Sequence, residues 1–199
     1  MAKVLIVYNN DPWVSLHNFF ESCGDEVKQY CYDRHVDFTS IVPPEMSESN
    51  VMQAMEHHDV CFIAAHGDFD SICNEQGEDV VSTRTTNYNL QDKMLYSVSC
   101  RCGVDLCPSL VRIGISLFVG YKDTFRVNEN YVPFIQSALA GLKSLINGEN
   151  AETAKENMYH EYEKQIDIAD ANDEVFTATL LLHNKESLVF EGDADYHLL

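Results

Sequence analysis

The sequence lacks several features that would assign it to a membrane or to nucleic acid. No apolar run approaches the roughly 20 residues that span a bilayer, and Met1 to Val7 show no cleavage pattern of a secretory signal. Bases are scarce, since 13 Lys and Arg stand against 32 Asp and Glu, for a formal net charge of −19. Nucleic acids bind to basic faces. We therefore expect a cytoplasmic protein without membrane or nucleic-acid partners.

Patterns of disulfide, metal and nucleotide sites are also missing. The seven cysteines are odd in number and irregularly spaced, so without a secretory signal we expect free thiols. There is no C-x-x-C pair, no H-x-x-x-H pair and no Gly-rich phosphate loop. The sequence therefore predicts no metal site and no cofactor. Four cysteines are expected to be small buried hydrophobic residues: Cys23, Cys31, Cys61 and Cys73.

Along the chain, short apolar runs typical of strands alternate with segments whose apolar residues recur at helical spacing. Strands are expected at 3–8, 26–33, 59–65, 94–99, 115–121 and 186–190, with a hairpin arm at 80–86. Helices are expected at 12–23, 49–57, 104–113, 128–147, 150–168 and 173–183. Asp11 and Pro12 would begin the first helix, Gly24 would end it, and 34–47 would be a loop. This order predicts an α/β fold with three layers, a mostly parallel sheet of about six strands, helices on both faces, and a single domain over 1–199.

Two blocks carry most of the functional information. Residues 60–67 are apolar and end in His66-Gly67, and residues 94–103 contain an apolar run that leads to Cys100. The carboxyl ends of parallel strands line the ligand crevice of an α/β sheet. If the two strands are neighbours, they lie roughly 4.8 Å apart, and the imidazole and the thiol face one crevice. This pairing is typical of a cysteine nucleophile with a histidine base.

Each residue of these blocks has an expected role. His66 can accept the thiol proton of Cys100, and a helix that begins near Gly103 would place its positive end beside the thiol. The backbone N–H groups of Gly67 and Cys100 could bind a tetrahedral oxyanion. Cys102 competes for the role of nucleophile, because two residues further along an extended chain it would point the same way.

The conjunction of the two blocks resembles the caspase-like cysteine peptidases of clan CD, which include caspases, metacaspases, separases, gingipains and CHAT domains. The matching residues are 64–67, Ala-Ala-His-Gly, and 98–103, Val-Ser-Cys-Arg-Cys-Gly. The Cys-x-x-Gly form and the block at 114–123 are closest to the CHAT, separase and metacaspase types. The resemblance implies a caspase-like fold, an endopeptidase with a His66–Cys100 dyad, a protein or peptide substrate and a regulatory protein partner. It also places Cys100, not Cys102, at the catalytic position.

The expected specificity rests on two carboxylates. Metacaspases carry an acid two residues before the cysteine, where this chain has Val98, so Asp123 and Asp68 are the remaining candidates for substrate binding. An acidic pocket would select Arg or Lys at P1, although Asp123 could equally cap a helix after its strand. The alternative to a peptidase is a catalytically inactive caspase-like or flavodoxin-like binding module that recruits a partner, because a fold alone does not decide function.

Overall fold

A six-stranded sheet forms the centre of the computed structural model, which describes residues 2–85 and 87–198. Across the sheet the strands follow the order β2-β1-β3-β6-β7-β8. Their bounds are Asp37–Ile41 for β2, Lys3–Tyr8 for β1, Val60–Ala64 for β3, Met94–Val98 for β6, Leu117–Tyr121 for β7 and Leu188–Gly192 for β8. The first five are parallel, and only β8 pairs antiparallel. The predicted mostly parallel sheet of about six strands is confirmed.

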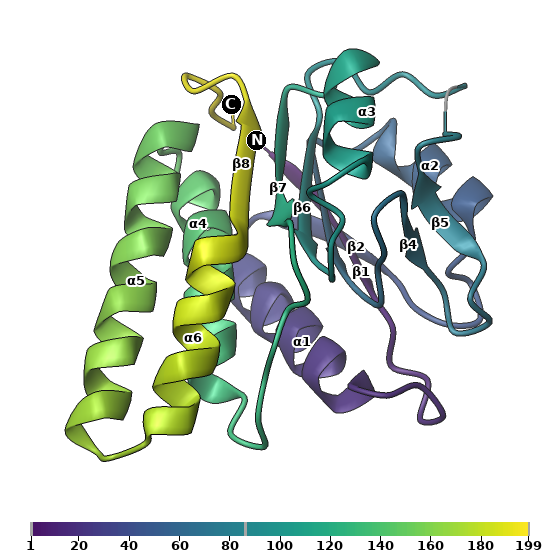
Figure 1. Cartoon of the computed structure of the whole chain (residues 1–199). Helices are drawn as coiled ribbons and strands as arrows, with labels where there is room; N and C mark the ends of the chain where they lie inside the picture. Colours follow the sequence, from purple (N-terminus) through teal and green to yellow (C-terminus); the bar gives the residue numbers. More distant parts are fainter. Residues whose placement is uncertain (1, 86, 199) are drawn as a thin grey trace.

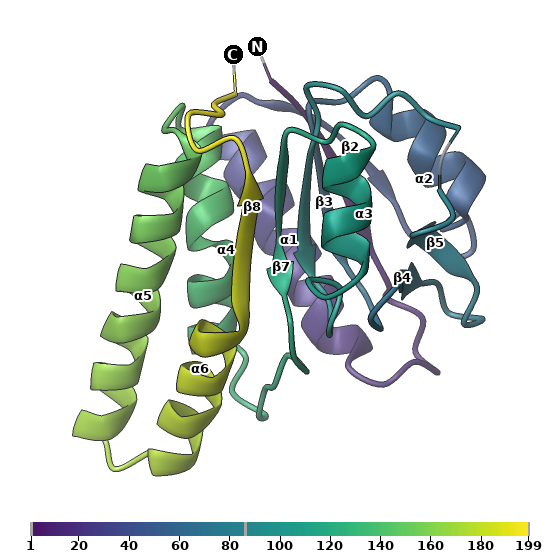
Figure 2. The same ribbon diagram turned by 45° about the horizontal axis from the view of Figure 1, so that its top comes forward.

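Helices cover both faces of this sheet, so the molecule has the predicted three layers (Figures 1 and 2). One face carries α1 (His17–Asp33), α4 (Val132–Ile146), α5 (Ala151–Ala171) and α6 (Val175–Ser187). The other carries α2 (Glu48–Met55), α3 (Leu106–Arg112) and the hairpin of β4 (Ser71–Cys73) and β5 (Asp79–Ser82). None of the helices in the two described stretches has the length and apolar character needed to cross a lipid bilayer.

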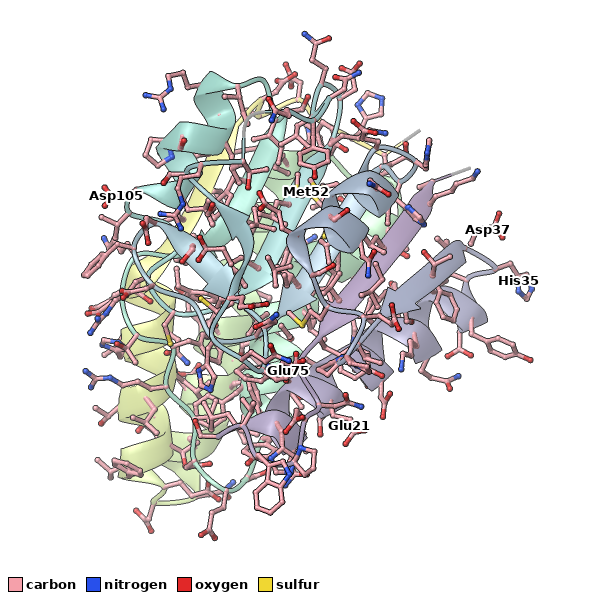
Figure 3. The ribbon with its side chains drawn as sticks, turned by 90° about the vertical axis from the view of Figure 1, so that its right-hand side faces the viewer. Glu21, His35, Asp37, Met52, Glu75 and Asp105 are labelled. Carbon is pink, nitrogen blue, oxygen red and sulfur yellow. The ribbon has the colours of Figure 1, made fainter. Side chains whose placement is uncertain are left out.

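The strands feed two separate cores because successive side chains of a strand point to opposite faces. In β1, Val4 and Ile6 pack on the α1 side, whereas Leu5 and Val7 pack on the α2 side. A strand that is buried on both faces is apolar at nearly every position, which explains the almost continuous apolar runs. Figure 3 shows the second face, where Met52 of α2 lies over the sheet and is fully buried.

The first helix differs from the prediction. It begins at His17 rather than near Pro12 and continues through 26–33, which we expected to be a strand. Gly24 does not end this helix but lies inside it, where a Cβ atom would be 2.5 Å from Cδ1 of Tyr8. The glycine therefore allows the helix to pack closely on β1. The prediction that it ends the helix is wrong.

The second strand was expected at 26–33 but lies at Asp37–Ile41, inside the predicted loop. Four of its five residues are exposed, since it is the outer edge of the sheet. Figure 3 shows His35 and Asp37 at this outer edge. Edge strands often carry polar side chains, and a strand without a buried face has no apolar alternation to reveal it.

The other predicted elements are confirmed with small changes in their ends. Ser47 caps α2, and its side chain accepts a hydrogen bond from the Asn50 N–H at 3.3 Å. The expected hairpin arm is β5, which pairs antiparallel with β4. Of that arm, Thr86 lies outside the described residues.

Candidate active site

His66 and Cys100 follow neighbouring parallel strands at the same edge of the sheet. Strands β3 and β6 pair in register, with Ala64 opposite Val98. His66 and Cys100 each come two residues after this last pair, so the register places them level with each other. The prediction that the two strands are adjacent and end at the same edge is confirmed.

The imidazole of His66 is oriented by the loop that follows β1. Its Nε2 lies 2.9 Å from the carbonyl oxygen of Ser15 and 3.1 Å from the Ser15 hydroxyl. A carbonyl oxygen only accepts hydrogen bonds, so its contact with Nε2 fits the tautomer in which Nε2 carries the proton. In the neutral ring Nδ1 then has a free lone pair. The ring also packs edge-on against Phe20, with 5.2 Å between ring centroids.

The thiol of Cys100 is half-buried on the α1 side of the sheet. Its Sγ lies 4.0 Å from the carbonyl oxygen of Phe125. Burial raises the pKa of this thiol above its ordinary value, and the Asp123 and Asp68 carboxylates raise the pKa further. The Phe125 contact and the Arg101 guanidinium act in the opposite direction. The resting environment therefore favours the neutral thiol.

No hydrogen bond within 2–85 and 87–198 joins His66 to Cys100. Since Nε2 is committed to Ser15, Nδ1 is the nitrogen that remains for the thiol. Catalytic contacts are often long without substrate and tighten when it binds. The arrangement thus places a histidine and a cysteine level with each other at one edge of the sheet.

Cys102 does not share the orientation of Cys100, in contrast to the prediction. The intervening Arg101 has a left-handed backbone, with φ of 58°, so the chain turns between the two cysteines. Cys102 enters the opposite core, is fully buried, and places its Sγ 3.5 Å from the Ser99 carbonyl oxygen. Its thiol is thus inaccessible at the edge where Cys100 lies.

Gly67 lies directly against the backbone of Cys100. A Cβ atom at Gly67 would be 2.7 Å from the Cys100 carbonyl oxygen and 3.4 Å from its nitrogen. Only a residue without a side chain fits there. Neither backbone N–H, of Gly67 or of Cys100, donates a backbone hydrogen bond among the described residues. Two free N–H groups therefore lie close together beside the thiol.

The helix after Cys100 is not placed as expected. Helix α3 begins at Leu106 rather than near Gly103. The N–H groups of Asp105 and Leu106 donate to the Phe69 carbonyl oxygen, at 3.1 and 2.9 Å. This helix end thus binds the loop after His66, and the expected stabilisation of the thiolate by it stays a prediction.

Both candidate carboxylates lie at the same edge, and both are exposed. Asp68 is 3.7 Å from the Arg101 guanidinium. Asp123 precedes no helix: its Oδ1 accepts a hydrogen bond from the Thr124 N–H, and its Oδ2 is 3.9 Å from Nε2 of His183. The Thr124 contact first, and then the nearby cations, lower the pKa of Asp123. Its side chain is 54% exposed, so it lies in no desolvated pocket.

The sequence prediction missed two residues of this edge. Ser15 fell inside the expected first helix, so its place in a loop beside His66 was hidden. His183 lies at the end of the predicted helix 173–183; it is partly buried, and its Nε2 contacts the Thr124 carbonyl oxygen at 2.9 Å. Within the described residues there is no group of three or more His, Cys, Asp or Glu side chains that could hold a metal ion.

Comparison with known proteins finds a match only at the level of structure. No family model and no curated protein matches the sequence. The crystal structure of the Arg-specific cysteine proteinase gingipain R superposes with a TM-score of 0.63 and 11% identity, over 98% of this chain and 47% of that one. The complex of the RgpB pro- and mature domains from Porphyromonas gingivalis gives a TM-score of 0.65 and 10% identity, over 98% and 48%.

The chain spans about half the length of these two matched structures. At such low identity the likeness concerns the fold alone. The chain has the caspase-like fold of the clan CD cysteine peptidases, as its sequence resemblance implied.

Proposed function

We propose that this protein is a cysteine endopeptidase in which Cys100 is the nucleophile and His66 the general base. The observation that carries the proposal is the level placement of the two residues on adjacent parallel strands. The Ser15 contact supports it, because it leaves Nδ1 of His66 able to accept a proton. The caspase-like fold, found in cysteine proteinases, supports the same chemistry.

In the proposed reaction Nδ1 of His66 takes the proton of the Cys100 thiol as Sγ attacks the peptide carbonyl carbon. A C–S bond forms, and the carbonyl oxygen becomes an oxyanion. The C–N bond then breaks, and the proton passes from His66 to the leaving amine. Water, deprotonated by the same imidazole, cleaves the thioester and restores the thiol.

The free N–H groups of Gly67 and Cys100 are the proposed oxyanion donors. Backbone donors fixed before the reaction cost no reorganisation, and each is typically worth about 10²–10³ in rate. The contact between Gly67 and the Cys100 backbone keeps the two donors close together.

The proposed substrate is a protein cut after Arg or Lys. Asp68 and Asp123 are the proposed partners of the cationic P1 side chain, because both contact Arg101, the residue after Cys100: the Asp68 carboxylate lies 3.7 Å from the Arg101 guanidinium, and the Asp123 carbonyl oxygen accepts the Arg101 N–H at 3.0 Å. The solved neighbours include an Arg-specific proteinase. Because both carboxylates are exposed and already face cations, we propose a modest preference rather than a strict one.

A binding module without activity is the rival function, and the raised pKa of the Cys100 thiol is the observation in its favour. Thiol alkylation distinguishes the two. Cys100 and Cys73 are the two cysteines that are not fully buried, so Cys73 serves as an internal control. With iodoacetamide near pH 7 and peptide mass spectrometry, we expect His66→Ala to slow the labelling of Cys100 and to leave that of Cys73 unchanged. Equal rates before and after the substitution would favour the binding module.

Cleavage itself is tested with a peptide library randomised at P1, using Cys100→Ala as the blank. The proposal expects cleavage by the unmodified chain alone, with Arg and Lys enriched at P1. Cleavage without that enrichment would retain the peptidase and reject the acidic specificity.

A further inference from the structure

A second surface, far along the chain from the dyad, combines exposed apolar side chains with a groove. Four apolar residues are unusually open to solvent where α5 turns into α6 and α4 begins: Val132 at 57%, Ile168 at 46%, Val175 at 68% and Phe176 at 67%. Val132 and Ile168 line a groove of about 320 Å³. Val175 and Phe176 lie between two further lining residues, Glu174 and Thr177. We call this surface the α5–α6 tip.

These exposed apolar side chains have no role in the packing of the core. Single exposed apolar residues are common on protein surfaces, but several together beside a groove mark interaction sites. Helix α6 buries Leu180 and Leu181 against the core, while its first turn directs Val175 and Phe176 to solvent. Two apolar side chains, Val175 and Phe176, therefore lie exposed at the turn between α5 and α6 and do not contribute to the core.

The charges around the tip have a single sign. Residues 127–133 and 165–182 contain five acids and no Lys, Arg or His; the acids are Glu129, Asp167, Asp170, Asp173 and Glu174. The basic residues next to these two ranges form ion pairs with acids outside the tip: Lys164 pairs with Glu161, and Lys185 pairs with Glu163. Arg126 acts on Asp123, whose pKa it helps to lower. The tip is thus apolar at its centre and acidic at its rim.

The tip is connected to the candidate site by residues 122–131, which follow β7 and run along α6 (Figure 1). The side-chain amide of Asn184 on α6 donates a hydrogen bond to the Arg126 carbonyl oxygen at 2.7 Å and accepts one from the Arg126 N–H at 2.8 Å. Further along, Asn128 donates a hydrogen bond to the Thr177 hydroxyl at 2.7 Å. At its start, the same segment places the Phe125 carbonyl oxygen 4.0 Å from the Cys100 sulfur. The segment 122–131 therefore joins the candidate site to the tip along the length of α6.

We propose that the α5–α6 tip is a docking site for a cationic amphipathic helix of the protein substrate, in which apolar side chains enter the groove and Lys or Arg side chains face the acidic rim. The role as a substrate site rests on the proposed peptidase function. The binding itself does not, because it needs no reaction at Cys100. Complementary charge brings such a segment to the surface, and apolar contact holds it there.

Binding is tested with a fluorescein-labelled 14-residue helix of Leu and Lys, by fluorescence anisotropy on the full chain carrying Cys100→Ala. Phe176→Ser is expected to weaken binding about tenfold, since it removes a large apolar contact. The matched control is Tyr32→Ser on α1, where the side chain is 71% exposed, and it should leave the affinity unchanged. If Phe176→Ser and Tyr32→Ser have the same effect, the proposal is wrong.

The acidic rim is tested with two pairs of substitutions that change the net charge equally. Asp170→Asn with Asp173→Asn should weaken binding several-fold and reduce its dependence on salt. Glu149→Gln with Glu156→Gln, at the opposite end of α5, should do neither. Equal losses from both pairs would show diffuse attraction to an acidic protein and would overturn the proposal, as would the absence of any binding. Every protein in these binding tests carries Cys100→Ala, so binding is measured without any reaction at Cys100. A negative result in the peptidase assay would therefore not affect this test.

Discussion

The two cysteines after β6 lie only two positions apart, yet they occupy opposite environments. Cys100 lies half-buried at the sheet edge on the α1 side, close to the Phe125 carbonyl oxygen. Cys102 lies fully buried on the α3 side, near Ser97 and Ser99. The left-handed backbone of Arg101 separates them. Spacing alone therefore does not say which thiol is accessible, because the turn at Arg101 places Cys102 on the opposite side of the sheet from Cys100.

The largest expected difference between the two cysteines is in catalysis. Cys100→Ala should reduce peptide cleavage by at least about 10⁴-fold, as the loss of a nucleophile does in other proteases. Cys102→Ala should retain cleavage, since its thiol does not reach the edge. Initial rates on the best library peptide measure both. Retained cleavage by Cys100→Ala would show that Cys100 is not the nucleophile. Loss of cleavage only in Cys102→Ala would assign that role to Cys102.

The next effect concerns the close contact at Gly67. Gly67→Ala places a Cβ atom 2.7 Å from the Cys100 carbonyl oxygen, so the backbone at Cys100 must move. Displacing an oxyanion donor should lower kcat by about 10²–10³-fold.

The control for this substitution is Gly77→Ala in the β4–β5 turn. Gly77 has a positive φ of 78° and open space around it, so alanine there strains the backbone without touching the site. It should lower stability and leave kcat unchanged. If Gly67→Ala and Gly77→Ala reduce kcat equally, the loss follows from stability and not from the geometry beside Cys100.

The third effect is on stability, and here Cys102 is expected to matter more than Cys100. Cys102→Ala removes a fully buried sulfur that fills space beside Gly120. It should lower the free energy of unfolding by about 1 kcal/mol, whereas Cys100→Ala at the half-buried edge should lower it less. Urea unfolding of the two variants measures the difference. A larger loss in Cys100→Ala would mean that Cys100 is the structural residue of the pair.

The smallest effect is on the pKa of the Cys100 thiol. Asp68 and Asp123 raise this pKa, so removing their charges stabilises the thiolate and lowers it. Asp68→Asn with Asp123→Asn should therefore speed the alkylation of Cys100 a few-fold near pH 7, and should move the rise of its rate to lower pH. Rates measured from pH 6 to 10 test this, with Cys73 followed in the same samples. Slower alkylation in the double variant would contradict the assigned sign.

Sequence patterns predicted the central strands well because those strands are buried on both faces. The run at β3 is apolar throughout and the run at β6 is interrupted only by the buried Ser97, and the residues that follow the two runs were identified directly. The sequence analysis treated the two strands as possible neighbours, and the structure pairs them. Such strands are easy to recognise, since nearly every position in the run is apolar.

The region from residue 9 to residue 41 was predicted poorly for identifiable reasons. Gly24 is an ordinary signal for a helix end, but here the Tyr8 ring fills the space beside it. Strand β2 has no buried face to give it a pattern. The contact between Ser15 and His66 joins residues 51 positions apart and depends on where α1 begins. Long-range contacts of this kind are not encoded in local periodicity.

The anchoring of residues 122–131 has a consequence for synthesis of the chain. These residues are held by His183 and Asn184, and β7 gains its second neighbour only when it pairs with β8. A ribosome releases the chain from its N-terminus, so His66 and Cys100 emerge long before these anchors. Until residues 183–192 follow, one side of the candidate site has nothing to hold it. If the proposed function holds, a nascent chain would thus carry His66 and Cys100 before the segment 122–131 beside them is anchored, and the candidate site would be complete only after residue 192 is released.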